Sequence, residues 1–429
     1  MARKMKDSGI EWIGEIPEGW EIKYFVQLFS QVKNKNIGLR EKNLLSLSYG
    51  KIKQKSIETV GGLLPDNFEG YNIIDRNDIV LRLTDLQNDQ HSLRVGLSPE
   101  RGIITSAYCS IRVRGAESPN YLYYYLHTFD IAKGFYGMGS GVRQGLNWDG
   151  LKYIKILLPP QHEQDRISVF LNQKTLEIDS MLSKTISSIE EYKKLKQAVI
   201  TQAVTKGVRG EREMKDSGVE WVSYIPVDWN TIKLKYCTYI RARLGWRALK
   251  ADEYVESGFP FLSAFNIVNN ALHFTNLNYI NQFRYDESPE IRLKVGDVLL
   301  VKDGAGIGKC AIVENMPIPS TVNGSIAVIS STSFITPKYL YYYFLSEMFQ
   351  QHIDLLKDGM GVPHLFQSDL KEIKIAFPSK DEQKEIADCL DAKCAEIDGL
   401  IAKKEQLAKE LESYRKSLIY EVVTGKREV

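Results

Sequence analysis

The sequence predicts an α+β fold in which two tandem domains of mixed α/β structure are separated by two long antiparallel helices. A pseudo-two-fold axis should relate the halves. Three observations support this prediction: an internal repeat, short strand-like runs between turn residues, and a long helical pattern closing each repeat. The expected boundaries are 1–159 for the first domain, 160–208 for the central helix, 209–378 for the second domain and 379–429 for the last helix.

The repeat covers nearly the whole chain. Residues 5–22 (MKDSGIEWIGEIPEGWEI) return as residues 214–231 (MKDSGVEWVSYIPVDWNT), with ten of eighteen positions identical. The tyrosine-rich stretch YLYYY at 121–125 and the Pro-x-x-x-Glu-Gln-x-x-Ile unit at 159–167 also return, at 339–343 and 378–386. Repetition on this scale indicates two copies of one domain, an arrangement that suits a two-fold or bipartite target.

Composition places few other limits on function. The 429 residues are 43% hydrophobic and 26% charged, with a formal net charge of +2, which is ordinary for a globular protein with two cores. The five cysteines form no C-x-x-C pair and the six histidines show no metal-type spacing, so neither a zinc site nor a disulfide framework is expected. The N-terminus shows no apolar leader, and no run of about 18 apolar residues occurs, so we expect a soluble cytoplasmic protein.

Each half begins with the segment that carries the Trp and Pro residues, which we call the Trp-Pro segment (5–22 and 214–231). It is expected to pack on a neighbouring part of the protein. Strand-like runs separated by Gly, Asn and Asp follow, as expected for strands joined by turns. These runs lie at residues 72–83, 102–113, 295–302, 309–313 and 325–330. The two YLYYY stretches follow a proline and are predicted to be short helices with aromatic residues turned inward.

A long amphipathic helix is predicted at the end of each half. Residues 161–205 contain neither Pro nor Gly, and residues 380–424 contain a single glycine, Gly399. Apolar residues recur every three or four positions, including Ile178, Leu182, Ile186, Ile189, Tyr192, Leu195 and Val199. So narrow a stripe is typical of a coiled-coil seam, which favours antiparallel pairing of the two helices. Folding of each helix back onto its own domain is the alternative.

Two basic clusters at corresponding places suggest nucleic acid as a partner. Residues 233–250 hold six Lys and Arg and no acid, and residues 23–55 hold eight against one acid. Cations held near phosphates release counterions and so supply affinity, and Arg can also read guanine edges. A solvated charged face is the alternative for either cluster alone.

Glycine-rich loops form a second pair of candidate sites, at residues 137–147 and 358–367. Glycine lets the backbone approach a phosphate closely, and the first loop adds polar side chains that can bond phosphates or bases. A tight turn before the following strand explains the loops equally well. Residues 303–310 (DGAGIGKC) fit neither a phosphate-binding loop nor a dinucleotide fingerprint, and a β-hairpin turn is predicted there.

The layout resembles the specificity subunits of type I restriction–modification enzymes. The segment GIEWIGEIP at residues 9–17 and the segment LPPQHEQDRI at residues 158–167 carry the resemblance, and their second copies at 218–226 and 377–386 strengthen it. Ser223-Tyr224 stands in place of Gly14-Glu15, a small departure. The resemblance covers residues 5–426.

The resemblance implies that each mixed region is a target recognition domain reading one half of a bipartite, asymmetric double-stranded DNA site. The helices would form a spacer between the half-sites, and the subunit would recruit two methyltransferase and two restriction (translocase–nuclease) subunits. Catalysis would belong to those partners, which use S-adenosylmethionine, ATP and Mg²⁺ for adenine-N6 methylation and site-specific DNA cleavage. This chain would itself hold no cofactor and no metal.

Three alternatives remain at this stage: a self-contained enzyme, a subunit of a methylation-only complex, and a scaffold that does not bind DNA. No cofactor motif or catalytic constellation supports the first. The candidates for DNA contact come from the basic clusters, the glycine loops and the predicted hairpin. They are Lys33, Lys35, Arg40, Lys51, Lys53, Gly139, Ser140, Gly141, Arg143, Gln144, Asn147, Arg241, Arg243, Arg247, Lys302, Lys309, Gly361 and His364.

Overall fold

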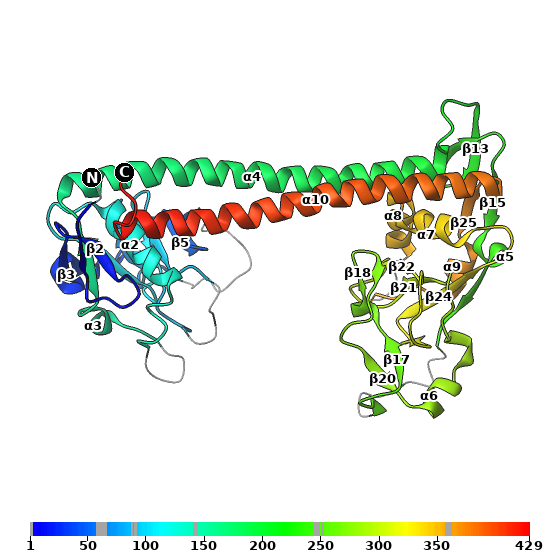
Figure 1. Cartoon of the computed structure of the whole chain (residues 1–429), viewed down its shortest axis with the longest axis horizontal. Coiled ribbons are helices and arrows are strands. Elements are labelled where there is room, and N and C mark those ends of the chain that lie inside the picture. Colours follow the sequence, from blue (N-terminus) through cyan, green and yellow to red (C-terminus); the bar gives the residue numbers. More distant parts are fainter. Residues whose placement is uncertain are drawn as a thin grey trace. The chain divides into compact units, whose positions relative to one another are not determined.

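The computed structural model describes residues 3–56, 67–86, 89, 92–139, 145–243, 249, 253–356 and 363–429. The chain forms two compact units. Unit 1 comprises Met1–Ile186 and Gln406–Val429, and unit 2 comprises Ser187–Glu405. Each unit therefore combines one repeat of the sequence with parts of both long helices (Figure 1). The mixed α/β content, the tandem repeat and the two long helices confirm the predicted fold class.

Unit 1 contains twelve strands and three short helices among its described residues. The strands are β1 (Met5–Asp7), β2 (Glu15–Pro17), β3 (Glu21–Tyr24), β4 (Phe29–Gln31), β5 (Leu44–Ser48), β6 (Lys51–Lys55), β7 (Asn72–Ile74), β8 (Ile79–Leu81), β9 (Val95–Leu97), β10 (Gly102–Ile104), β11 (Cys109–Val113) and β12 (Lys155–Leu158). The helices are α1 (Phe25–Leu28), α2 (Pro119–Ile131) and α3 (Trp148–Leu151).

Unit 2 repeats this series with additions. Its strands are β13 (Met214–Val219), β14 (Val222–Pro226), β15 (Asn230–Lys233), β16 (Thr238–Arg241), β17 (Phe259–Leu262), β18 (Ile267–Val268), β19 (Ala271–Leu272), β20 (Asn278–Ile280), β21 (Val298–Val301), β22 (Cys310–Ile312), β23 (Thr321–Val322), β24 (Ile326–Ser331) and β25 (Lys374–Phe377). Its helices are α5 (Leu234–Cys237), α6 (Gln282–Asp286), α7 (Pro337–Leu345), α8 (Glu347–Leu356) and α9 (Gln367–Glu372), with 3-10 turns η3 (Ala264–Asn266) and η4 (Pro289–Ile291).

The two units share one sheet topology. An antiparallel four-stranded sheet has the order β4-β11-β8-β9 in unit 1 and β16-β24-β21-β22 in unit 2. A second sheet contains one parallel pair in each unit, β5 with β10 and β17 with β23. Strands β3 and β12 pair antiparallel, as do β15 and β25. The duplication seen in the sequence is therefore a duplication of fold.

Each Trp-Pro segment forms a β-hairpin, β1 with β2 and β13 with β14, and buries its second tryptophan. Trp20 donates its indole N–H to Glu163 at 2.9 Å, and Arg3 pairs with the same carboxylate. In unit 2, Arg212 pairs with Glu382 in the corresponding way. Each segment therefore packs on the first turn of the long helix of its own repeat. The contacts made there provide partners for the carboxylates of Glu163 and Glu382.

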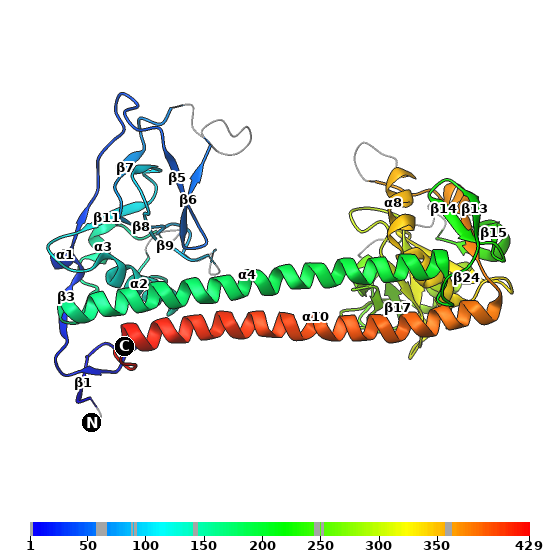
Figure 2. The ribbon, with the colours of Figure 1, turned by 90° about the horizontal axis from the view of Figure 1, so that it is seen from above.

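The long helices are α4 (Gln161–Lys206) and α10 (Lys380–Val423), close to the predicted bounds. In unit 1 the beginning of α4 lies beside the end of α10 and runs antiparallel to it (Figures 1 and 2), and Arg415 pairs with Asp179 at 2.7 Å. In unit 2, Lys196 pairs with Asp398 at 2.6 Å. Among the described residues, no helix combines the length and apolar character needed to cross a membrane.

The apolar stripe of α4 is only partly buried. Ile178 and Ile189 are buried as expected, but Ile186 and Leu195 are 55% and 48% exposed. The prediction that all seven stripe residues form one seam is therefore wrong. A narrow helix contact covers the residues that point directly at the partner and leaves those beside the seam in solvent.

Both YLYYY helices form as predicted, α2 and α7, each with a proline in its first turn. Tyr121 and Tyr339 are fully buried, and their hydroxyls donate to the carbonyls of Leu157 and Ala376. The predicted run 72–83, in contrast, is two strands in two different sheets, β7 and β8, separated by a turn. The run 102–113 divides in the same way into β10 and β11.

Candidate nucleic-acid interface

The central strands β8 and β21 give each unit two edges that can be compared directly. We call the residues before these strands (75–78 and 294–297) the N-terminal edge. The residues after them (from 82 and from 302), with the loops held against them, are the C-terminal edge. The sequence-predicted DNA contacts divide between these edges and the neighbouring second sheet.

A buried aspartate occupies the same position at the N-terminal edge of both units. Asp78 and Asp297 are 1% and 2% exposed. Asp78 accepts a hydrogen bond from the amide of Asp75 at 2.7 Å, and Asp297 accepts one from the amide of Lys294 at 2.8 Å. A buried carboxylate needs a cation and hydrogen-bond donors, so each unit is expected to supply a cation here.

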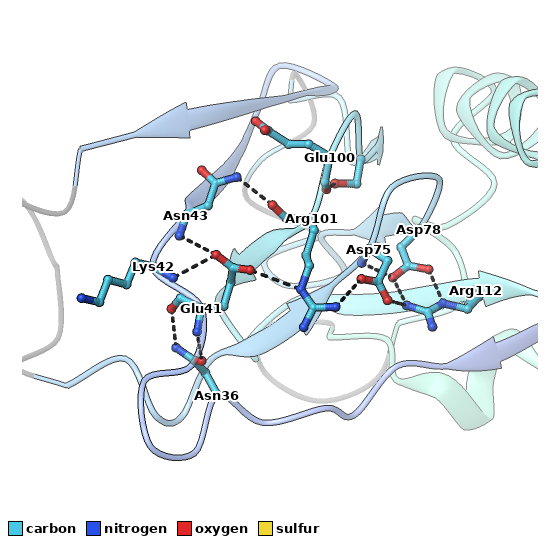
Figure 3. A network of polar contacts seen from close by, with 10 residues as sticks. Asn36, Glu41, Lys42, Asn43, Asp75, Asp78, Glu100, Arg101 and Arg112 are labelled. Carbon is cyan, nitrogen blue, oxygen red and sulfur yellow. Dashed lines mark hydrogen bonds and ion pairs between the residues drawn. The ribbon is translucent and has the colours of Figure 1, made fainter.

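In unit 1 that cation is Arg112, which belongs to a wider network (Figure 3). Arg112 donates to both oxygens of Asp78 at 2.7 Å and to Asp75 at 2.6 Å. Arg101 then bridges Asp75 at 2.9 Å and Glu41 at 3.2 Å. Hydrogen bonds from the Asn43 and Lys42 amides hold the pKa of Glu41 below its ordinary value. The network fastens the segment before β5 to β7 and β11.

In unit 2 the cation comes from a different strand. Ser330 takes the position of Arg112 on the equivalent strand, and Arg241 of β16 donates to Asp297 at 3.1 and 3.2 Å and to Ser330 at 2.6 Å. Arg241 was predicted to contact DNA. The structure commits most of its guanidinium to the interior of the fold instead, so this DNA contact stays a prediction without structural support.

The remaining basic candidates differ in how far the fold engages their side chains. Arg243 is buried, pairs with Glu287 at 3.7 Å and lies over the ring of Phe261. Lys35 donates to the carbonyl of Gly70 at 2.7 Å, and Arg40 to that of Lys35 at 3.3 Å. Lys33 is exposed after β4.

Two lysines of β6, Lys51 and Lys53, share the exposed face of that strand, and Lys51 pairs with Asp179 of α4 at 2.5 Å. Arg247 lies outside the described residues. Most of the described cations of the two basic clusters that were predicted to contact DNA are therefore already engaged in contacts within the fold.

The C-terminal edge of unit 2 brings together residues of the predicted hairpin turn and of the second glycine loop. Residues 302–309 form the predicted hairpin turn between β21 and β22. The glycine-loop residues that follow lie against this turn: the amide of Gly304 donates to Pro363 at 3.0 Å, and that of Leu365 to Lys302 at 2.9 Å. His364 and Lys302 both contact the Asp303 carboxylate, and Lys309 is exposed in the same turn. Gly361 lies outside the described residues.

The C-terminal edge of unit 1 has the same backbone connection. The amide of Leu146 donates to Leu83 at 2.9 Å. Asn147 is exposed and caps α3, its side chain accepting from the amide of Gly150. Gly139 is half-buried. The candidates outside the described residues are Ser140, Gly141, Arg143 and Gln144.

A buried arginine shapes this edge in unit 1. Arg94 is 0% exposed, and its guanidinium donates to the carbonyls of Arg82 at 3.1 Å and Thr84 at 2.7 Å and to the hydroxyl of Tyr136 at 3.1 Å. It therefore holds the connection between β8 and β9 from the inside. In unit 2 the shorter turn 302–309 replaces this connection, and the exposed Lys309 stands directly before β22. Equivalent edges thus carry different loops.

Comparison with known proteins agrees with this architecture. A family described as the type I restriction modification DNA specificity domain matches residues 226–412. Over 96% of its length the chain is 24% identical to the type I restriction enzyme MjaVIII specificity subunit of Methanocaldococcus jannaschii, covering 93% of that protein. It is 27% identical to the putative MjaX specificity subunit of the same organism, again over 96% of this chain and 95% of that protein.

Solved structures show the same fold. A chain from a study of complex assembly and conformational transition of the type I R-M system matches with a TM-score of 0.71 at 15% identity, covering 96% of this chain and 99% of that chain. The HsdS subunit of Thermoanaerobacter tengcongensis matches with a TM-score of 0.52 at 15% identity, covering 96% and 98%. The chain is therefore similar over nearly its whole length to specificity subunits of type I restriction enzymes, and residues 226–412 match the DNA specificity domain of that family.

Some features of this structure could not be found by sequence reasoning. Arg94, Asp303 and the Asp78–Arg112 pair carry no local signal, since each depends on a residue distant in sequence. The turn at Tyr49-Gly50, between two alternating runs, could have been predicted as a hairpin. Among the described residues, no group of three or more His, Cys, Asp or Glu side chains is placed to hold a metal ion.

Proposed function

We propose that this specificity subunit selects a bipartite, asymmetric DNA target, with unit 1 reading one half-site and unit 2 the other. The observation that carries the proposal is one framework with two different C-terminal edges. The shared sheets hold the loops in corresponding places, while the 82–94 connection and the 302–309 turn differ in length and chemistry. Two identical readers would select identical half-sites, so different loops on one framework favour an asymmetric target.

The C-terminal edges supply the chemistry that DNA recognition needs. Lysines such as Lys309 can neutralise phosphates, which positions the protein without selecting a sequence. In unit 2, Asp303 orients the imidazole of His364, and an oriented ring nitrogen can bond a base edge in the major groove. Specificity then depends on which side chains each edge presents.

We further propose that catalysis belongs to partner subunits. The related proteins are named as specificity subunits of type I restriction enzymes, which supports assembly with methyltransferase and restriction subunits. In this proposal the partners bind S-adenosylmethionine, ATP and Mg²⁺, and this chain binds none of them. Two methyltransferase subunits, one for each repeat, would match the duplicated framework.

A map of N6-methyladenine across the genome tests the proposal. We expect cells with the gene to methylate one motif, two short half-sites around a fixed unspecified gap, and cells without the gene to lose that motif. Replacing residues 21–158 with the corresponding region of another specificity subunit should change one half-site only. An unchanged methylation map after deletion, with the methyltransferase subunits expressed, would contradict the proposal.

A further inference from the structure

Each unit presents one strongly exposed aromatic side chain in the turn that follows the strand starting its parallel pair. Phe265 follows β17 and is 92% exposed, and Tyr49 follows β5 and is 80% exposed. Strands β5 and β17 occupy equivalent positions in the two units because each pairs parallel with the strand that leads into the four-stranded sheet. Both aromatic residues therefore belong to the repeated design.

Phe265 lies at the C-terminal edge of unit 2. A series of backbone hydrogen bonds links its turn to the candidate DNA contacts. The amide of Asn323 donates to Leu262 at 2.8 Å, and the amide of Lys302 donates to Ser325 at 2.8 Å. The ends of β17, β23 and β21 thus meet at one edge, where Lys302 also contacts the loop that carries His364.

The turn that carries Phe265 is fixed by a buried side chain. Asn266 is 6% exposed; its side-chain carbonyl accepts from the amide of Ser263 at 2.9 Å, and its side-chain amide donates to Thr275 at 3.2 Å. These bonds hold the ends of the turn, so the phenyl ring projects from a rigid base. A ring with 92% of its surface in water contributes almost nothing to the core.

Tyr49 adds an independent sign of function, because its backbone is in an unfavourable conformation. Ser48 pairs with Lys51, so Tyr49 and Gly50 form a two-residue hairpin turn with φ values of 47° and 74°. Asn-Gly is the preferred pair in such a turn, and an aromatic residue at a positive φ is rare. A strained residue whose ring stabilises nothing in the fold points to a role outside it.

We propose that Phe265 and Tyr49 stack on DNA bases, each at the half-site that its unit reads. Aromatic and apolar side chains can insert between base steps and partly unstack them, and stacking tolerates any base because every base has a π-face. The inference rests on the proposed DNA-reading function and adds a contact outside the hydrogen-bond readout. Recognition would then include local opening of the base stack beside the loops.

The first test compares two exposed phenylalanines of unit 2. Phe283 is 71% exposed and follows β20, whose end pairs with the beginning of β17, so it lies away from Phe265. In the full-length chain with its methyltransferase partner, F265A should weaken binding to the methylated motif roughly 10-fold. The matched control F283A should bind like the wild type, and F265W should retain binding.

An abasic duplex separates a stacking role from any other role. When an abasic site replaces the contacted base, the ring has no base to stack on, so F265A should bind this duplex nearly as well as the wild-type chain does. A loss that persists on this duplex, or no loss on the intact duplex, would overturn the stacking proposal. If the wild-type chain shows no preference for the motif, the proposed function itself fails, and the two failures are thereby distinguished.

Tyr49 allows a test in which stability and binding move in opposite directions. Y49N keeps the turn, relieves the strain and removes the ring, so the unfolding midpoint should rise while DNA binding falls by a similar roughly 10-fold factor. Y153A, at a residue that is 77% exposed, serves as the control. A Y49N variant that binds the motif like the wild type would overturn the proposal for unit 1.

Discussion

At the scale of single residues, two buried groups on α2 have pKa values displaced toward their uncharged forms. Burial raises the pKa of Asp130 to about 6, although the amide of Arg94 donates to its carboxylate at 2.6 Å. Burial, reinforced by Arg415 and Lys416, lowers the pKa of His127 to about 4. The two residues therefore contribute pH dependences of opposite sign over the same range.

The direction in which Asp130 makes stability depend on pH follows from proton binding. Between about pH 4 and pH 6 the folded chain holds a proton that the unfolded chain releases, so this residue stabilises the fold at low pH and loses that effect as the pH rises through 6. As the pH rises from 4 to 7, the free energy of unfolding of Asp130→Asn should therefore increase relative to that of the wild type, by up to about 3 kcal/mol. Urea unfolding at a series of pH values measures this difference.

His127→Gln provides the comparison of opposite sign. The unfolded chain binds a proton to His127 below about pH 6.5 while the folded chain does not, so the wild type loses stability from this residue as the pH falls toward 4. The free energy of unfolding of the variant should therefore rise relative to that of the wild type as the pH falls toward 4. Curves for the two variants that run parallel to the wild-type curve would contradict both assignments.

Reasoning from the sequence was least informative at this scale. Arg241 belongs to a stretch without acidic residues and therefore looked available to DNA, but Asp297, 56 positions further along the chain, pairs with it. His364 and Asp303, 61 positions apart, meet only because two loops adjoin. Side-chain partners distant in sequence leave no local signal, so composition cannot distinguish a cation bound in the fold from one free for phosphate.

At the scale of elements, glycines distinguish the end of a helix from its interior. Gly425 follows α10 with φ 74°, and an added Cβ would lie 2.4 Å from Pro17 and 3.1 Å from Trp20. Gly399 lies within α10, and an added Cβ there would meet nothing within 4 Å. The same substitution should therefore have opposite effects on stability at the two positions.

Gly425→Ala should destabilise unit 1 by roughly 2 kcal/mol, because the left-handed backbone and the contact with Pro17 both oppose a methyl group. Gly399→Ala should stabilise α10 by about 1 kcal/mol through helix propensity. Thermal unfolding of both variants under one set of conditions measures the difference. Equal midpoints would show that the end of α10 does not pack on the Trp-Pro segment as the structure shows.

A second element-scale prediction concerns the ion pair between Arg212, just before the Trp-Pro segment, and the long helix of unit 2. The Glu382 side chain is 1% exposed and pairs with Arg212. Removing one partner of a buried ion pair leaves the other charge uncompensated. Glu382→Gln should therefore destabilise unit 2 by roughly 3 kcal/mol. Hydrogen exchange of the β13–β14 hairpin should increase, whereas Glu385→Gln, at an exposed pair with Arg209, should leave it nearly unchanged.

The helices themselves could be predicted from the sequence, and the sheets could not. Residues 161–205 contain neither Pro nor Gly, and their periodicity gives α4 within one residue of its end. Residues 72–83 look like one strand, yet a turn at Asp75–Asp78 sends β7 and β8 into separate sheets. Strand partners are chosen by contacts far apart in sequence, which a local pattern cannot supply.

At the scale of the whole molecule, α4 and α10 both contribute residues to unit 1 and to unit 2. If these helices act as the spacer between half-sites, inserting seven residues after both Ile186 and Glu405 adds roughly 10 Å of helix. The unspecified gap in the methylated motif should then grow by about three base pairs, with both half-sites retained. Methylation mapping reads this directly, and an unchanged gap would contradict the spacer role.

The buried aspartates have a consequence for exchanging parts between recognition domains. Asp78 takes its cation from the strand β11, whereas Asp297 takes it from β16, the counterpart of β4. A chimera joined inside this sheet would leave one carboxylate without a guanidinium, or would bury two guanidinium groups together. Chimeras joined just before the long helices, at Pro159 or Pro378, keep each pair intact. Recombination at those junctions should therefore yield folded chains with new DNA specificities, whereas recombination within the sheet should yield destabilised chains.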